Sequence, residues 1–538
     1  MKGTCIPDHK ISLSIFGSLW SMSKLIMNKT RFGLPAFKNL DACLISLIGL
    51  IMILIYTRHG GIGISPDSIA YLSVARNIIM HGSPVDYTLS PLVDFPVCYP
   101  FFLSIVGFVS GQDPLVIAPW LNGLLFAGLI VLLGSLINSF EGVTRSYKWI
   151  ILICIALSPS LLEIYSMLWS ETLFILFTIV FISAFGRYLR KRSVISLLCC
   201  ALIASAACIT RYAGVTIIGA GLMLLVFDRS LEWKKKLRHC LWFGLGSISL
   251  LLINLLRNRL ITGSLTGPRE PGILTLSDNL IFTGRVICNW LPVSGQQSEL
   301  VSGVAILVLI VISLLFLKRS WSGIVTLSTE NCFAAFFIVY TVFITGISTI
   351  SHFEQINNRL LSPLYIPMVI SLTSWVPRVI RRLPVLTMRL AGALAILIAS
   401  GFAVYQYEQV SIMYDEVKGS GIPGYTEDAW KNSETAGFLR KRADYFDPAY
   451  EVYSNAHEAA YFNGGLITES LPQRRDKRDT FELLNGDAFY LIWFDDFSDN
   501  ELVKFRTIRQ HADLIKKYDF KDGDIFFVRP RHSSAQQR

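Results

Sequence analysis

The sequence has few charged residues for its length. Only 16% of its 538 residues are Asp, Glu, Lys or Arg, while 52% are hydrophobic. Soluble domains carry about 25% charged residues. This shortage excludes an ordinary soluble enzyme and favours a chain that keeps most of its surface in contact with lipid.

Cysteine motifs are also missing. The ten cysteines include no C-x-x-C pair and no Cys/His spacing of the kind that binds zinc. Most lie in apolar segments, where we expect them to act as small core residues. No cysteine follows Cys332. The C-terminal part therefore cannot contain disulfides, and we expect it to depend on its own core and on docking to the rest of the chain.

Long hydrophobic runs are what the sequence has instead. Several reach about 20 residues, the length that crosses a bilayer as a helix. We predict a mainly α polytopic membrane helix bundle of about eleven crossings, at residues 41–57, 115–139, 147–164, 170–187, 194–210, 212–228, 239–256, 298–317, 331–350, 360–377 and 385–405. The segment 101–110 is too short to cross, and we expect it to form an interfacial helix.

Lysine and arginine are distributed unevenly between the predicted crossings. They concentrate in the N-terminal segment 1–40 and in every second connection after it. The positive-inside rule then places the N-terminus in the cytoplasm. This distribution accounts for the net charge of +10 without a nucleic-acid partner, so we predict the bilayer as partner and no nucleic acid. An odd number of crossings places the C-terminus outside the cell's inner membrane.

Near Tyr405 the composition changes from long apolar runs to the mixed composition of a soluble domain. We predict a transmembrane domain at 41–405 and an extracytoplasmic soluble α/β domain at 406–538. Within the latter, strand-like runs lie at 450–454, 489–494 and 524–528, and helix-like runs at 428–442 and 499–511.

Two outward connections, 58–114 and 257–297, are longer than the others, and long patterned loops usually carry function. In the first, Ser65 is a plausible N-cap and Pro66 fits the first helical position. Asp67 then lies in the first turn, and Tyr71 shares its face. We interpret this segment as a helix on the membrane surface that presents a carboxylate at the water–lipid boundary. The alternative is that Asp67 only caps the helix.

Further ionisable residues lie at outward ends of the crossings. Guanidinium groups there suit a phosphate or pyrophosphate headgroup, and a nearby carboxylate can accept a proton from a hydroxyl. Each residue also has a simpler interpretation. Arg211 and Arg259 fit headgroup anchors, Glu171 a helix start and Glu163 a solvated loop charge. For Tyr99 and Trp169 we expect an interfacial aromatic belt.

Several segments, taken together and in order, resemble a known family. They are SPDSIAYLSVARNIIMHG with YPFFLS, LSPSLLEIYSMLWSETLF, ITRYAG, LLRNRLITGSLTGPR, NNRLLSPLYIP and the later GYTEDAW and VYSNAHEAAYFNGG. The chain resembles the GT-C membrane glycosyltransferases over most of residues 40 to 470. It is most similar to the branch of protein mannosyltransferases and aminoarabinose transferases that depend on polyprenyl phosphates.

The resemblance implies a reaction and roles for individual residues. An inverting enzyme would move a sugar from a polyprenyl-phosphate donor to a glycolipid, polysaccharide or protein acceptor. Asp67 matches the first-loop general base, and Arg359 matches a late-loop arginine that contacts the lipid phosphate. The remaining substrate-binding candidates are Tyr71, Glu171, Arg211, Arg257 and Arg269.

One departure from the family concerns metals. Some relatives carry an acidic pair in the first loop, whereas Asp67 is followed by Ser68. We therefore predict no metal and no cofactor, with arginine supplying positive charge for the leaving phosphate.

Two other classes of function remain open. A transporter or flippase of lipid-linked sugars should show polar residues in mid-membrane and repeated halves. Here the ionisable residues lie at the ends of the crossings, and no repeat is apparent. A non-catalytic scaffold for envelope assembly is the third class, and it requires no role for Asp67.

Overall fold

The computed structural model describes residues 39–267, 270–293, 298–321, 328–352, 354–497 and 499–531. The chain divides into two compact units, residues 1–41 and residues 42–538. The predicted cytoplasmic segment 1–40 lies almost entirely outside the described residues. The account below concerns the second unit.

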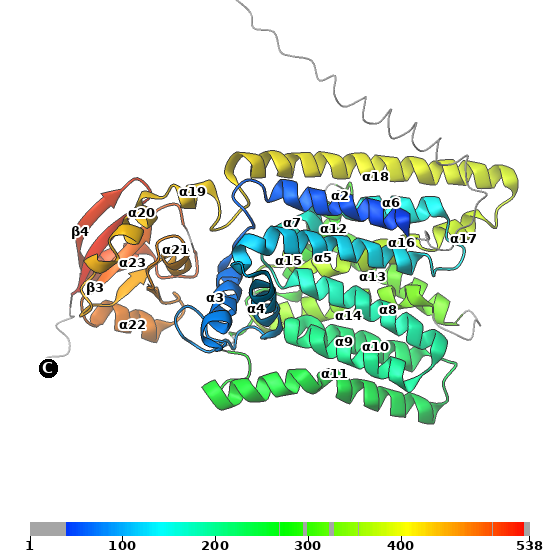
Figure 1. Ribbon diagram of the computed structural model, residues 1–538, viewed down its shortest axis with the longest axis horizontal. Coiled ribbons are helices and arrows are strands. Elements are labelled where there is room, and N and C mark those ends of the chain that lie inside the picture. The colour runs from blue at the N-terminus through cyan, green and yellow to red at the C-terminus, as the bar shows by residue number, and fades with distance from the viewer. Residues whose placement is uncertain are drawn as a thin grey trace, which may run out of the picture. The chain divides into compact units, whose positions relative to one another are not determined.

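Helices make up most of the described chain (Figure 1). The helices that precede the C-terminal domain are α2 (Leu40–Tyr56), α3 (Pro66–His81), α4 (Cys98–Ser110), α5 (Pro114–Ile137), α6 (Arg145–Ala156), α7 (Pro159–Ser166), α8 (Glu171–Lys191), α9 (Val194–Thr210), η2 (Tyr212–Gly214), α10 (Val215–Phe227), α11 (Trp233–Thr262), α12 (Leu276–Trp290), α13 (Ser298–Trp321), α14 (Thr329–Ile350), α15 (Asn358–Leu361), η3 (Ser362–Leu364), α16 (Tyr365–Thr373), α17 (Val376–Ile380) and α18 (Val385–Ser420).

The predicted crossings correspond to these helices. Among the described residues, seven segments are long and apolar enough to span a membrane, and the bent pair α6–α7 adds an eighth. Three shorter apolar helices, α2, α9 and η2–α10, coincide with the other predicted crossings at 41–57, 194–210 and 212–228. Helix α4 is also short, in agreement with the expectation that this segment does not cross.

Two crossings are broken at prolines. Helices α6 and α7 meet at an angle of 48°, and Pro159 is the first residue of α7. The span 358–380 consists of α15, η3, α16 and α17, with Pro363 at the start of η3. Proline lacks the backbone N–H that continues a helix, so a new element begins near each proline, and at Pro159 it also takes a new direction. These breaks place the short helices α7 and α15 beside the candidate site described below.

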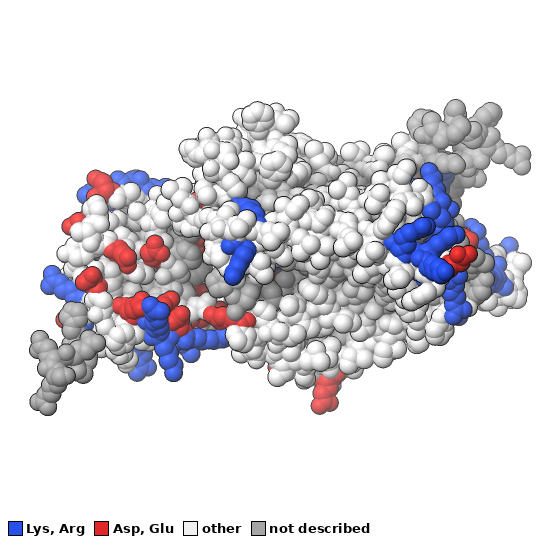
Figure 2. Space-filling view, turned by 90° about the horizontal axis from the view of Figure 1, so that it is seen from below, with Lys and Arg blue, Asp and Glu red and all other residues white. Residues whose placement is uncertain are grey.

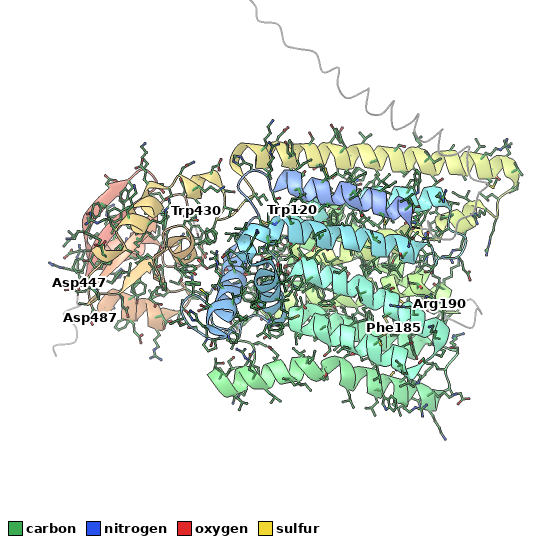
Figure 3. All side chains as sticks on the ribbon, viewed as in Figure 1. Trp120, Phe185, Arg190, Trp430, Asp447 and Asp487 are labelled. Carbon is green, nitrogen blue, oxygen red and sulfur yellow. The ribbon has the colours of Figure 1, made fainter. Side chains whose placement is uncertain are left out.

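Charged side chains gather at the ends of the helix bundle. In Figure 2 the surface over the middle of the bundle is almost free of charge, and a dense lysine and arginine cluster covers one end. Helix α11 begins at this end with Lys234, Lys235 and Lys236, and α8 finishes with Arg190 and Lys191. Figure 3 labels Arg190 at the end of α8 that lies away from the C-terminal domain. This separation is what a bilayer-spanning bundle requires.

The C-terminal domain is built on a five-stranded mixed sheet of order β2-β1-β3-β5-β4. Strands β1 and β2 are parallel, as are β1 and β3, whereas β5 is antiparallel to both β3 and β4. In register, Leu491 of β3 pairs with Phe526 of β5. The elements are α19 (Asp428–Lys431), α20 (Glu434–Lys441), η4 (Ala443–Tyr445), β1 (Val452–Ser454), α21 (His457–Phe462), β2 (Glu469–Ser470), α22 (Lys477–Asn485), β3 (Phe489–Phe494), α23 (Phe505–His511), β4 (Ala512–Phe520) and β5 (Gly523–Pro530).

The α/β prediction for this domain is confirmed, with corrections to individual elements. The predicted strand 489–494 is β3. The predicted helix 428–442 is two helices, α19 and α20, because Ser433 caps a new helix through its hydroxyl. The predicted helix 499–511 begins only at Phe505. Helix α18 continues through residue 405, the predicted domain boundary, to Ser420.

The C-terminal domain packs on the connection 58–114, here called the first outer loop. The Tyr425 backbone N–H donates to the Ile64 carbonyl at 2.8 Å, and the Thr426 hydroxyl donates to the Ile62 carbonyl at 3.0 Å. Tyr87 stacks on Tyr461 with ring centroids 4.1 Å apart. Inside the domain, Trp430 (labelled in Figure 3) packs against Tyr425 and Phe494. A continuous apolar cluster therefore joins α3 and α4 to the sheet.

Candidate active site

Helix α3 begins where the sequence predicts. Ser65 is its extended N-cap residue, with Pro66 in the first position, and the Ser65 backbone N–H donates to the Ser68 hydroxyl at 3.1 Å. Asp67 therefore lies in the first turn, where the helix dipole favours a carboxylate. Its side chain is 24% exposed, so it borders on solvent while its helix is anchored in the apolar cluster.

A backbone bridge holds this helix start against a second segment. Gly63 donates to the Ser166 carbonyl at 2.9 Å, and the Leu168 N–H donates to the Gly63 carbonyl at 3.0 Å. A side chain at Gly63 would collide with Met167 and Ile422. Glycine therefore allows the two strands of chain to approach closely. The bridge brings Asp67 near residues 169–171.

Two carboxylates from distant parts of the chain, Asp67 and Glu171, meet at Arg359, which lies in α15. Its Nη2 pairs with Asp67, and its Nε donates to Glu171 Oε1 at 2.7 Å. The other Glu171 oxygen accepts from Arg211 Nη1, also at 2.7 Å. Glu171 is only 1% exposed. A buried carboxylate held by two arginines keeps its charge and fixes both guanidinium groups in place.

Two further residues contact the Arg359 guanidinium, Trp169 at its face and Glu354 at its outer edge. The guanidinium lies over the Trp169 ring, 4.4 Å from the centroid, in a cation–π contact. The Trp169 indole N–H donates to the Ser65 hydroxyl at 2.8 Å. Glu354 approaches Nη1 at 3.7 Å. Arg359 is therefore oriented by four neighbours and remains at the border of solvent.

Tyr71 closes the cluster on its inner side. Its hydroxyl is 3.3 Å from the Ser170 hydroxyl, which in turn accepts from Arg211 at 2.9 Å. Its ring packs edge-on against Tyr99. Burial, with the Asp67 carboxylate beside it, raises the pKa of the Tyr71 phenol. Tyr71 therefore stays neutral and can act as a hydrogen-bond donor.

The structure thus brings together five of the seven predicted site residues: Asp67, Tyr71, Glu171, Arg211 and Arg359. Arg257 is not among their contacts. Its Nη1 donates to the Leu92 carbonyl at 2.9 Å, which ties α11 to the first outer loop. Arg269 lies outside the described residues. The roles of these residues with substrate remain predictions.

Three expectations for single residues are wrong. Trp169 and Tyr99 do not form an interfacial belt, because Trp169 is buried under Arg359 and Tyr99 is buried against Tyr71. Glu163 is not a solvated loop charge, since it is half-buried and accepts from Asn358 at 2.6 Å. A sequence signal for this cluster is present in WSE at 169–171, which places an aromatic ring, a hydroxyl and an acid at the start of a helix.

The arrangement suits chemistry on a phosphate ester. It offers one partly exposed carboxylate beside a fixed guanidinium, and a second guanidinium behind a buried acid. Among the described residues, no group of three or more His, Cys, Asp and Glu side chains lies close enough together to hold a metal ion. The prediction that no metal or cofactor takes part stays a prediction.

No family model matches the sequence, and no curated protein matches it either. Solved structures do. ArnT from Cupriavidus metallidurans in the apo state has a TM-score of 0.53 and 11% identity, over 90% of this chain and 97% of that one. The same protein bound to undecaprenyl phosphate has a TM-score of 0.55 and 10% identity, with the same coverage.

The oligosaccharyltransferase of Archaeoglobus fulgidus, in complex with zinc and sulfate, has a TM-score of 0.52 and 11% identity over 84% of this chain and 68% of that one. These proteins are GT-C glycosyltransferases. The chain has the GT-C fold. The GT-C fold accounts for a helix bundle joined to a small α/β domain. It confirms the fold that the sequence resemblance implies.

Proposed function

We propose that the protein is an inverting glycosyltransferase that moves a sugar from a polyprenyl-phosphate donor to an acceptor hydroxyl. The observation that carries this proposal is the pairing of Asp67 with Arg359 at the solvent border of a GT-C fold. A base and a phosphate-binding cation side by side are the two groups that such a transfer needs.

The donor class is supported by the relative's ligand. ArnT, which aligns with 90% of this chain, has been solved with undecaprenyl phosphate. A guanidinium binds phosphate oxygens in a bidentate way and stays charged in a partly buried site. Arg359 is the candidate for this contact, with Arg211 behind it and with Arg257 in α11 and Arg269 as further candidates.

In the proposed reaction, Asp67 accepts the proton of the acceptor hydroxyl as its oxygen attacks the anomeric carbon. The new carbon–oxygen bond forms on the face opposite the phosphate. The bond between the anomeric carbon and the phosphate oxygen breaks, and its electron pair leaves with the lipid phosphate. Inversion at that carbon follows, and Arg359 offsets the charge that develops on the leaving group.

The ion pair between Asp67 and Arg359 implies that the donor binds before Asp67 accepts a proton. While Arg359 is paired with Asp67, the carboxylate and the guanidinium occupy each other. A donor phosphate competes for the same guanidinium. Its binding would free Asp67 to accept a proton, so the base would become active only after the donor is in place. Glu171 and Trp169 would hold Arg359 during this exchange.

The site lies at the end of the bundle that carries the C-terminal domain, opposite the lysine and arginine cluster. The positive-inside rule then assigns the site to the outer face of the inner membrane, with the N-terminus in the cytoplasm. The acceptor would be a glycolipid, a polysaccharide or a protein, with the C-terminal domain beside the site in a position to receive it.

The proposal is tested with purified protein in nanodiscs and a panel of radiolabelled polyprenyl-phosphate sugars, with envelope glycolipid and polysaccharide as acceptors. Transfer by the native protein and its loss in Asp67→Asn are expected. Asp86→Asn is the matched control, since Asp86 belongs to the same outer loop and only organises its own turn. Label that crosses the bilayer without transfer would instead identify a transporter. The absence of both transfer and transport would favour a scaffold.

A further inference from the structure

A cavity of about 480 Å³ lies beside the charged cluster. Its walls come from α7, the end of α12, the start of α15, the start of α16 and the middle of α18. The volume is within the range of small-molecule sites. Asn358 lines the cavity, while the next residue, Arg359, belongs to the charged cluster. Helix α15 therefore separates the two.

Asn358 organises one wall of this cavity. Its Oδ1 accepts from the Ser160 hydroxyl at 2.6 Å and from the Trp290 indole N–H at 2.8 Å. Its Nδ2 donates to Glu163 at 2.6 Å. Three polar side chains from two helices, α7 and α12, are thus held in fixed orientations. The Glu163 carboxyl group has acceptor capacity beyond this single bond, so Glu163 can also accept hydroxyl protons from a ligand.

The opposite wall holds an unpartnered acceptor. Gln406 in α18 is 2% exposed, and its Nε2 donates to the Cys154 carbonyl at 3.0 Å and to the Tyr365 hydroxyl at 2.8 Å. Its Oε1 is buried and has no partner among the described residues. A buried acceptor without a donor costs about 1–3 kcal/mol. The wall is therefore suited to a ligand that brings a hydroxyl donor.

The lining also sets the charge of that ligand. Glu163 is the one charged residue among the described residues that line the cavity, and no lysine, arginine or histidine lines it. The other polar groups are amides and hydroxyls, including Asn289, Asn357 and Gln409. A phosphate or carboxylate would meet a carboxylate without a cation to balance it. A neutral ring with many hydroxyls meets acceptors, donors and the ring of Trp290.

We propose that this cavity is a binding site for a neutral sugar ring, separate from the phosphate-binding cluster. The inference rests on the proposed function only in the choice of a sugar among neutral polyols. It assigns Glu163, Gln406 and Gln409 as ligand-binding residues, and Asn358 as the residue that positions Glu163.

The test measures binding alone, so its failure and the failure of the transfer reaction are distinguishable. Nanodisc-embedded full-length protein is mixed with the methyl pyranosides of glucose, mannose and galactose and with methyl arabinofuranoside. Saturation-transfer NMR then reports contact. Gln409→Trp fills the cavity from α18. The matched control is Tyr407→Trp on the same helix, because Tyr407 is 63% exposed and does not line the cavity.

We expect at least one neutral glycoside to show saturation transfer with the native protein and with Tyr407→Trp. The signal should fall at least about fivefold in Gln409→Trp, and methyl glucuronide should give none because no cation lines the cavity to balance its carboxylate. Undecaprenyl phosphate should bind all three proteins. No neutral glycoside signal, an equal signal in Gln409→Trp, or equal binding of the glucuronide would each overturn the proposal.

Discussion

Arg359 and Glu171 are 188 positions apart in the sequence, and their side chains meet at 2.7 Å. Glu171 is buried at the start of α8, and Arg359 extends from α15 to the border of solvent. Because Glu171 has two oxygens, it holds Arg359 with one and Arg211 with the other. This carboxylate holds both guanidinium groups in place, and Arg359 pairs with Asp67 on its other side.

Removing the charge of Asp67 should tighten the binding of undecaprenyl phosphate while it abolishes transfer. In Asp67→Asn the donor phosphate no longer competes with a carboxylate for Arg359. A partly exposed ion pair is worth up to about 1 kcal/mol, which corresponds to about a fivefold change in Kd. Titration of nanodisc-embedded protein with the lipid measures this. Weaker binding in Asp67→Asn would contradict the exchange of Arg359 between carboxylate and phosphate.

Neutralising Glu171 should destabilise the protein. In Glu171→Gln two partly buried guanidinium groups lose the buried charge between them, and breaking a buried pair costs about 3–5 kcal/mol. Thermal unfolding in detergent should show a clearly lower Tm. Glu354→Gln is the matched control, because Glu354 is 46% exposed and contacts Arg359 at 3.7 Å. Its effect should stay below about 1 kcal/mol. Equal effects of the two substitutions would contradict the central role of Glu171.

Replacing Trp169 should weaken the contacts that orient the Arg359 guanidinium. Trp169→Leu removes both the cation–π contact and the hydrogen bond to Ser65, and a desolvated cation–π contact is worth up to about 2 kcal/mol. Trp169→Phe keeps a ring and should lie between the native protein and Trp169→Leu. Tm and the Kd for undecaprenyl phosphate should follow this order. If Trp169→Phe and Trp169→Leu behave alike, the hydrogen bond matters and the ring does not.

The stacked pair Tyr87 and Tyr461 should couple the outer loop to the C-terminal domain. A double-mutant cycle of Tyr87→Ala and Tyr461→Ala should give a coupling energy of about 1 kcal/mol. Hydrogen exchange of α21 should increase in each single variant. Tyr450→Ala serves as control, since Tyr450 packs on Tyr490 and Phe527 within the domain. A coupling of Tyr87 with Tyr450 as large as that with Tyr461 would argue against a direct contact.

Much of the fold could be predicted because its signals are local. Apolar runs identify the membrane helices, and the Ser65–Pro66 pair marks the start of α3. The strand β3 follows from its run of aromatic and branched residues. The 48° bend at Pro159 was not predicted, because an apolar run does not show where a helix changes direction. Strand β4 was missed for a similar reason, since its exposed, charged face hides the alternation.

Most residues of the candidate site could be predicted from the sequence, but the contacts between them could not. Asp67 is a candidate from its place in the first turn of a loop helix and from the family resemblance, and Arg359 is a candidate because the resemblance implies it. Their pairing depends on the bridge between Gly63 and Ser166–Leu168 and on the break before α15. These are tertiary features with no sequence period. The bond from Asn358 to Glu163 joins residues 195 positions apart and was invisible for the same reason.

Helix α18 has 36 residues, about 54 Å at 1.5 Å per residue, against about 30 Å of bilayer hydrocarbon. It is held before its end by the bond from the Tyr56 hydroxyl to the Val410 carbonyl at 2.6 Å and after its end by the bond from Tyr425 to Ile64. One extra residue in the last helical part, between Val410 and Ser420, would rotate everything beyond it by about 100° and raise it by about 1.5 Å. The two contacts therefore fix the length of the stretch between them, and insertions there should be tolerated far less than insertions near residue 385.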